Sequence, residues 1–280
     1  MDIVDKPDEV RARVHSWREE GHSVGFVPTM GALHEGHLSL IRASVAECDR
    51  SVVSVYVNPT QFGEGEDLEA YPRRLQDDAR KVDEEGGNLV FAPSDAIMYP
   101  EGYSTYVIQK GLTERLCGAH RPGHFRGVLT IVMKLFHIVN PDVAFFGRKD
   151  YQQYVILQRM VRDMNMAVTV KAQPIVREDD GLAVSSRNEY LSKSERCQAA
   201  CLHEALQTAR EMFHNGKKNV ENLRDAMREI VESNPDTHIE YVDIVSPDDL
   251  QSMKTADEGA VAVMAVYVGE TRLIDNMPLG

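Results

Sequence analysis

The stretch that decides the fold is GFVPTMGALHEGHLSLI, residues 25–41. It begins within a short apolar run of strand type, Val24–Val27, which ends at Pro28. A tight loop of mostly small residues follows, and an amphipathic helical pattern starts near Leu38, just after two histidines three positions apart. The stretch therefore predicts a strand, a loop and the first turn of a helix, with two imidazoles on that turn.

The junction of this loop with this helix predicts a site for an anion. The first N–H groups of a helix lack a partner inside the helix, and the helix dipole adds partial positive charge there, so phosphates bind at such ends. Gly31 and Gly36 let a ligand approach the backbone. Because residues three apart share a helix face, His34 and His37 can donate hydrogen bonds to one phosphate chain.

Two alternatives stand beside the anion site. Histidines near a helix start are often surface or capping residues, and two of them can also belong to a zinc site. However, the stretch lacks the H-E-x-x-H pattern, and no cysteine lies close to it in sequence. The preceding P-T-M-G, at a strand-to-helix junction, favours a nucleotide.

Composition narrows the class of protein. The chain has 280 residues, 42% of them hydrophobic, which is enough for one large domain or two smaller ones with a sizeable core. The net charge of −13 argues against general nucleic-acid binding, which depends on Lys and Arg. No cysteine pair has C-x-x-C spacing, which predicts free thiols in a reducing compartment and neither disulfides nor structural zinc. The four cysteines are Cys48, Cys117, Cys197 and Cys201.

We expect neither a secretory signal peptide nor a membrane span in this sequence. Its first residues, MDIVDKPDEV, have neither a basic region nor an apolar core of the kind that signal peptides carry. No apolar run reaches the length of a membrane span. We expect a cytoplasmic protein without membrane contact.

Strand and helix patterns alternate over residues 1–176, which predicts a Rossmann-like, doubly wound parallel sheet with its ligand at the carboxyl ends of the strands. Strands are expected at 23–28, 51–57, 88–92, 103–109, 142–146 and 167–176. Helices are expected at 7–20, from 36 onward, and at 71–85, 128–139 and 151–164.

The pattern changes after residue 176. A loop at 177–191 leads to two amphipathic helices, 192–214 and 219–233, and then to strands near 238–245 and 260–268. Helices followed by strands predict a small α+β domain with an antiparallel sheet. We expect one domain at 1–176 that binds the ligand and a second at 177–280 that forms a lid over the site.

Three polar segments follow predicted strands, so one crevice could collect them: residues 28–37, 58–62 and 147–150. Lys149 suits a phosphate, and Asp150 suits a ribose hydroxyl or a hydrated Mg²⁺. The plain alternative is a solvated turn at these two residues and an ordinary turn at Gln61. The loop at 177–191 is either a flexible phosphate clamp or a linker capped by serine.

Four separated motifs resemble one family. P-T-M-G-A-L-H-E-G-H closely resembles the ATP-binding motif of pantothenate synthetases (pantoate–β-alanine ligases), relatives of the nucleotidyltransferases and class I aminoacyl-tRNA synthetases. Residues 147–153 match the family pattern G-x-K-D-x-Q-Q, and residues 121–128 match R-P-x-H-F-x-G-V. Residues 177–188 look like the family's counterpart of the KMSKS loop. Two positions depart from the usual pattern, Arg148 and Val184.

The resemblance implies a two-step ligase that uses ATP and Mg²⁺, forms a pantoyl adenylate and works as a homodimer on small molecules. It implies that His34, His37, Lys149 and Arg187 are catalytic, that Gln61 and Gln153 bind pantoate, and that Gln61 also binds β-alanine. No metal ligand set is implied, since Mg²⁺ arrives with ATP and lies near Asp150. The implied ATP-binding residues are Met30, Gly31, Ala32, Leu33, His34, Glu35, Gly36, His37, Gly147, Arg148, Lys149, Asp150, Val176, Val184, Ser185, Ser186 and Arg187.

Further expectations concern the surroundings of this site. Tyr71, His124 and Arg126 are weaker candidates for its wall, and the acidic segment Gly63–Leu68 is the candidate lid loop. Three other functions remain open from the residues alone: a tRNA-charging synthetase fragment, a nucleotidyltransferase that stops after the first step, and a nucleotide-binding sensor. The net negative charge of the chain argues against the tRNA-charging fragment.

Overall fold

The computed structural model describes all 280 residues, and the chain divides into two compact units. Unit 1 comprises Met1–Glu114, Gly118–Arg148 and Ile156–Pro174. Unit 2 comprises Arg115–Cys117, Lys149–Val155 and Ile175–Gly280, so the chain enters it three times. No helix is both long and apolar enough to cross a membrane.

Unit 1 is built on a parallel sheet of six strands, which confirms the predicted Rossmann-like class. The strand order is β1-β4-β3-β2-β5-β6, and every neighbouring pair is parallel. The central strands are buried over most of their length, as continuous apolar runs require. Chain order reverses between β2 and β5, where open sheets of this type bind ligands. The strands are β1 (Asp2–Val4), β2 (Val24–Thr29), β3 (Arg50–Val55), β4 (Leu89–Phe91), β5 (Val143–Gly147) and β6 (Thr169–Gln173).

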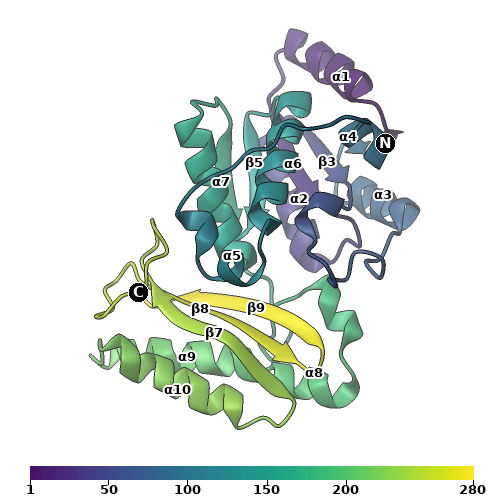
Figure 1. Cartoon of the computed structure of the whole chain (residues 1–280). Helices are drawn as coiled ribbons and strands as arrows, with labels where there is room; N and C mark the ends of the chain where they lie inside the picture. The colour runs from purple at the N-terminus through teal and green to yellow at the C-terminus, as the bar shows by residue number, and fades with distance from the viewer. The chain divides into compact units, whose positions relative to one another are not determined.

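Helices cover the faces of this sheet (Figure 1). Of the 16 residues of α6, 12 are buried, so it is a core helix rather than a surface helix. A further helix, α7, begins in unit 2 and ends in unit 1. The helices up to β6 are α1 (Pro7–Glu19), α2 (Glu35–Glu47), α3 (Leu75–Glu84), α4 (Asp95–Met98), α5 (Cys117–His120), α6 (His124–Val139) and α7 (Tyr151–Asp163).

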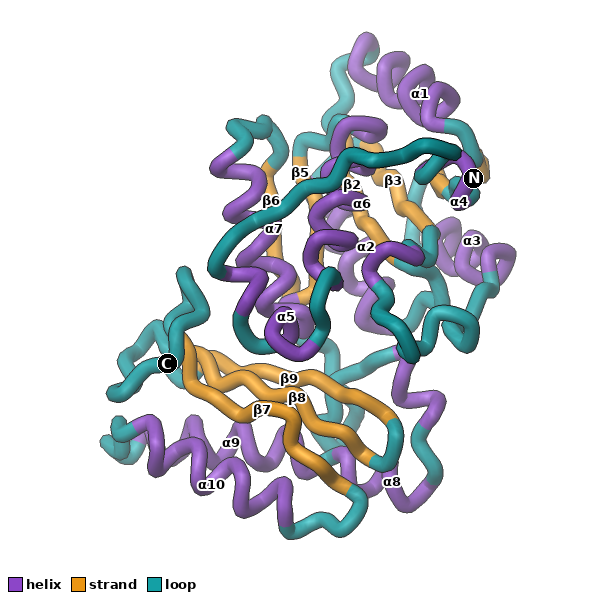
Figure 2. Tube along the Cα trace, in the orientation of Figure 1, coloured by secondary structure: helices purple, strands orange, loops and turns teal.

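The predicted strand at 103–109 is wrong, because this segment is an extended loop (Figure 2). Its contacts go to α6 and α7 instead of to a sheet edge. The N–H of Val107 donates to Thr130 Oγ1 at 3.0 Å, and the Lys134 ammonium lies 4.4 Å from the centre of the Tyr103 ring. The segment therefore packs against helices and joins no sheet.

Unit 2 contains an antiparallel sheet of three strands, in the order β7-β8-β9, which confirms the predicted α+β pattern. The predicted helix at 192–214 is two helices, and the third strand was not predicted. The helices are α8 (Lys193–Ala199), α9 (Cys201–His214) and α10 (Val220–Glu232). The strands are β7 (Thr237–Val245), β8 (Val261–Val268) and β9 (Thr271–Pro278).

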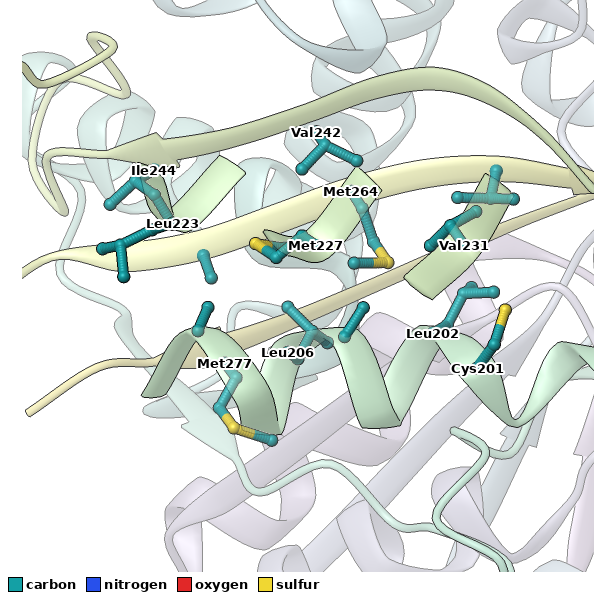
Figure 3. Close-up of a cluster of buried hydrophobic side chains, with 14 of the residues drawn as sticks. Cys201, Leu202, Leu206, Leu223, Met227, Val231, Val242, Ile244, Met264 and Met277 are labelled. Atoms are coloured by element: carbon teal, nitrogen blue, oxygen red, sulfur yellow. The ribbon is translucent and has the colours of Figure 1, made fainter. Parts of the chain in front are cut away.

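The core of unit 2 lies between this sheet and helices α9 and α10 (Figures 1 and 3). Leu206 of α9, Met227 of α10 and Met264 of β8 are fully buried in it. Burying each such side chain contributes roughly 1.5–3 kcal/mol. The two helices therefore cover one face of the sheet.

Candidate active site

The loop after β2 is held in an unusual backbone conformation. Gly31 has φ +84° and Ala32 has φ +51°, so two consecutive residues lie in the left-handed region. Thr29 Oγ1 accepts from the Gly31 N–H at 3.2 Å and donates to the Ser54 carbonyl at 2.7 Å. The loop is thereby folded tightly back on the end of its own strand.

Two main-chain donors of this loop are already used. The N–H groups of Ala32 and Leu33 donate to the two oxygens of Asp78, at 3.0 and 2.7 Å. The first N–H groups of α2, from Glu35 and Gly36, have no partner inside the helix. A phosphate at this junction is therefore offered the start of α2 rather than the loop itself.

The two predicted catalytic histidines lie together. Their ring centroids are 4.1 Å apart, and both residues are half-buried. The N–H of His34 points at His37 Nδ1 across 3.4 Å. Because Nδ1 of His37 faces a donor, the neutral ring carries its proton on Nε2, where it can be donated to a ligand.

Gln61 ends a short turn, Pro59–Gln61, that follows β3. Its Oε1 accepts from Asn58 Nδ2 at 3.0 Å, and its Nε2 lies 3.0 Å from the sulfur of Met30. Gln61 and the loop after β2 therefore meet in unit 1, through Met30. Asn58, only 1% exposed, was not assigned a role from sequence, although it opens the polar turn after a strand. The hydroxyl of Tyr99 also donates to Asn58 Oδ1, at 2.7 Å.

The candidate lid loop is tied to the start of α6. Arg121 donates to both carboxylate oxygens of Glu66, from Nε at 2.7 Å and from Nη2 at 2.6 Å. Burial alone would raise the pKa of Glu66, but the hydrogen bonds and charge of Arg121 outweigh it and bring that pKa to about 2. Arg121 Nη1 also lies 3.0 Å from His124 Nε2. The other ring nitrogen of His124, Nδ1, lies 2.7 Å from the carbonyl oxygen of Gln61.

The other wall candidates make different contacts. The guanidinium of Arg126 lies 4.9 Å from the centre of the Tyr106 ring, on the extended loop. Tyr71 is buried and packs edge-on against Phe62, with ring centroids 6.0 Å apart. His124, in contrast, contacts the Gln61 carbonyl directly.

The G-x-K-D-x-Q-Q segment begins in unit 1, with Gly147 and Arg148, and continues in unit 2 into the start of α7. Lys149 and Asp150 form a turn of 3₁₀ helix, and the Lys149 carbonyl accepts from Asn276 Nδ2 of β9 at 2.9 Å. Gln153 is half-buried one turn later. Gln152, in contrast to Gln153, is buried, and its Nε2 donates to the Arg115 carbonyl at 2.7 Å.

The 177–188 loop is also anchored to β9. Arg177 contacts both oxygens of the buried Asp275, at 2.6 and 2.9 Å, and the Gly181 carbonyl at 2.9 Å. Farther along, the N–H of Val184 donates to the Val176 carbonyl at 3.0 Å. Ser185 precedes a turn of 3₁₀ helix, Ser186–Tyr190, and its Oγ accepts from the Arg187 N–H at 3.3 Å. These contacts fix the predicted loop within unit 2.

No group of three or more His, Cys, Asp or Glu side chains comes together in the chain. The four cysteines are free thiols.

A family model described as pantoate-beta-alanine ligase matches residues 2–278. The chain belongs to this ligase family. A pantothenate synthetase from Syntrophotalea carbinolica is 51% identical over 99% of this chain and 98% of its own length. One from Heliobacterium modesticaldum is 50% identical, with 99% of both chains covered.

Solved structures of the same ligases have the same fold. The pantothenate synthetase of Thermus thermophilus matches with a TM-score of 0.95 and 44% identity, covering 100% of this chain and 99% of its own. The Francisella tularensis ligase, complexed with beta-gamma ATP and beta-alanine, matches with a TM-score of 0.83 and 32% identity, over 100% and 98% of the two chains. The protein is therefore a ligase of pantothenate biosynthesis.

Proposed function

We propose that this ligase condenses pantoate with β-alanine at the expense of ATP, through a pantoyl adenylate. The observation that carries the proposal is the pair His34 and His37 at the start of α2, beside a loop whose own donors are already paired. The complex of the Francisella tularensis relative with beta-gamma ATP and beta-alanine supports the choice of substrates.

In the first step, a carboxylate oxygen of pantoate attacks the α-phosphorus of ATP, and pyrophosphate leaves. No general base is needed, since a carboxylic acid with a pKa of about 4 is already ionised at neutral pH. In the second step, the free amine of β-alanine attacks the acyl carbon, the nitrogen gives up one proton, and the bond from the acyl carbon to the phosphate oxygen breaks. AMP leaves, and pantothenate is the other product.

The first step needs charge stabilisation on the departing pyrophosphate. In unit 1 we assign this role to His34 and His37, with the N–H groups that open α2. In unit 2 we assign it to Lys149 and Arg187. The remaining contacts to ATP are proposed for Met30, Gly31, Ala32, Leu33, Glu35, Gly36, Gly147, Arg148, Asp150, Val176, Val184, Ser185 and Ser186.

Pantoate is proposed to bind through Gln61 and Gln153, because an amide can serve both its hydroxyl and its carboxylate groups. Gln61 is also proposed to contact β-alanine. Its amide is already oriented by Asn58 at 3.0 Å, which leaves its remaining lone pair and N–H for a substrate. Asn58 thus becomes a supporting residue for substrate binding.

Mg²⁺ is proposed to accompany ATP and to neutralise charge on its phosphates. Asp150 is exposed and forms no ion pair, and a carboxylate of this kind suits a hydrated Mg²⁺. We also propose that the enzyme works as a homodimer in the cytoplasm, with no nucleic-acid partner. Gel filtration with light scattering tests the dimer.

The adenylate route is tested with pantoate labelled with ¹⁸O in its carboxylate. If the proposal is right, one labelled oxygen appears in AMP, and pyrophosphate is released only when pantoate is present. Label in inorganic phosphate, with ADP as a product, would mean an acyl phosphate and would refute the route. Omitting β-alanine separates a ligase from a nucleotidyltransferase, because only the ligase needs it for multiple turnovers that release AMP.

A further inference from the structure

We propose that Asp78 on α3 is a positioning residue for adenylate formation. It fixes the loop at 31–33 so that His34 and His37 face the phosphates of ATP. The inference rests on the proposed function, because it assumes that these two histidines act on ATP. Asp78 belongs to none of the sequence motifs. It lies on a helix whose other polar residues are mostly charged, as in a helix exposed to solvent.

The surroundings of Asp78 are unusual for a carboxylate. Its exposed fraction is 0%, and buried carboxylates normally have a cation beside them. Here both oxygens accept main-chain N–H groups instead, from Ala32 at 3.0 Å and from Leu33 at 2.7 Å. Hydrogen bonds to a charged acceptor are stronger than neutral ones, so this contact holds the two peptide groups firmly.

The loop needs such a contact, because its conformation is intrinsically unfavourable. Ala32 has φ +51°, a value that a residue with a Cβ adopts at a cost, and it follows Gly31 at φ +84°. A Cβ on Gly31 would lie 3.0 Å from Asp78 Oδ2, so the glycine also lets the carboxylate approach. One turn later on α3, Lys81 Nζ donates to the Leu33 carbonyl at 2.8 Å.

These three contacts have a direct consequence for the histidines. Helix α3 holds both the N–H and the carbonyl of Leu33, and the next residue is His34. The direction in which the chain enters α2 is thereby set, and with it the positions of both imidazoles. A misplacement of about 1 Å in a group that stabilises a transition state can cost roughly 10² in rate.

The test is Asp78→Asn, which keeps the shape but replaces one acceptor oxygen by a donor. We expect kcat for pantoate-dependent exchange of pyrophosphate into ATP to fall roughly 10²-fold. The KM for ATP should rise, while the KM for pantoate should change by less than about threefold. Asp83→Asn is the matched control, since Asp83 lies on the same helix but is 62% exposed, and it should leave all three constants near those of the wild type.

A purely structural role gives a different result. Titrating active sites would then show fewer competent molecules, each with normal kcat and normal KM for ATP, and the proposal would be overturned. Unchanged exchange in Asp78→Asn would overturn it as well. His37→Ala is measured in parallel: full activity of that variant would refute the proposed ATP site, whereas an impaired His37→Ala beside a normal Asp78→Asn would refute only the positioning role.

Discussion

Each unit carries one loop proposed to face ATP, and a buried aspartate anchors each of them in a different way. In unit 1, Asp78 accepts directly from the backbone of the loop, so it determines the positions of individual peptide groups. In unit 2, Asp275 contacts the side chain of Arg177 at the start of the loop, well before Ser185 and Arg187. The first anchor controls local geometry, and the second is an ion pair inside a folded unit.

The two anchors should therefore affect different properties. The first should affect the positions of side chains that act on ATP, and the second the stability of unit 2. A carboxylate that holds strained peptide groups affects where the next side chain points, so its loss should appear mainly in kinetic constants. An ion pair whose acidic side chain is only 1% exposed is costly to break, because the remaining charge stays buried without a partner. Loss of the second anchor should therefore appear first in the free energy of unfolding.

Asp275→Ala is expected to give the largest effect. It leaves Arg177, 19% exposed, without its carboxylate, and breaking such a buried pair typically costs about 3–5 kcal/mol. Urea unfolding followed by circular dichroism measures this change. If unit 2 unfolds separately, its own transition should shift to lower urea.

A double-substitution cycle provides the control. Arg177→Ala combined with Asp275→Ala should be less destabilised than the sum of the two single variants, because the orphaned charge is gone. A loss below about 1 kcal/mol in Asp275→Ala would mean that the pair is effectively solvated, and the contrast between the two anchors would fail.

His37→Ala and Lys149→Ala compare the two units in catalysis. Each removes one donor proposed to stabilise the departing pyrophosphate, and loss of such a donor costs roughly 10²–10³ in kcat, or about 3–4 kcal/mol. Steady-state release of pyrophosphate measures both variants. His15→Ala is the control, since His15 is exposed on α1 and pairs only with Glu19.

Unequal losses would sharpen the comparison. A deficit confined to His37→Ala would leave Arg187 as the only proposed contact of unit 2 with the leaving group. A near-normal kcat in both variants would remove the proposed chemical role from both residues.

The site loop in unit 1 was predictable because its signals are local. An apolar run, a proline, glycines and helical spacing all fall within residues 24–41, and the structure has β2, a loop and α2 in that order. Asp78 was not predictable, since its partners Ala32 and Leu33 lie far away in sequence and its helix resembles any charged surface helix. A contact of this kind becomes visible only after the chain has folded.

Unit 2 was harder to predict for a related reason. Strand β9 was missed because it buries Asp275 and Asn276, so its pattern does not alternate as a half-exposed strand should. In unit 1, strand β1 was also missed, because it has only three residues and pairs at the sheet edge. The polar residues of β9 that hide the strand are the same ones that hold Arg177 and Lys149.

Gln61→Ala and Gln153→Ala test whether each unit also supplies a contact to pantoate. Each amide is proposed to pair with a buried polar group of the substrate, and leaving such a group unpaired costs about 1–3 kcal/mol. The KM for pantoate should rise in both variants, while ATP affinity, measured by calorimetry, stays close to that of the wild type.

Equal losses for pantoate and ATP would place these residues in the nucleotide pocket instead. Gln158→Ala, on the same helix α7 as Gln153 but on its exposed side, is the control for the substitution itself.

The smallest expected effect concerns acid stability and compares an ion pair in each unit. In unit 1, the bonds from Arg121 bring the pKa of Glu66 to about 2, against 4.5 for an ordinary glutamate. In unit 2, Arg196 lowers the pKa of Asp180, but that carboxylate is 41% exposed. Partial burial should make the first pair matter more than the second.

The direction of this pH dependence follows from the number of protons that the native and unfolded states bind. Since the native pKa of Glu66 lies below its unfolded value, the unfolded chain binds more protons at acid pH. The pair therefore stabilises the native state fully above about pH 5, and this contribution is lost as the pH falls toward 2. The difference in unfolding free energy between wild type and Glu66→Gln should shrink by about 1–2 kcal/mol between pH 6 and pH 3, a range reduced for the exposed part of the pair. Asp180→Asn, measured in the same way, should show a much smaller change, because solvent already screens its pair. An equal pH dependence in the two variants would mean that the Glu66 pair is screened as well, and the candidate lid loop would then lack a strong tie to α6.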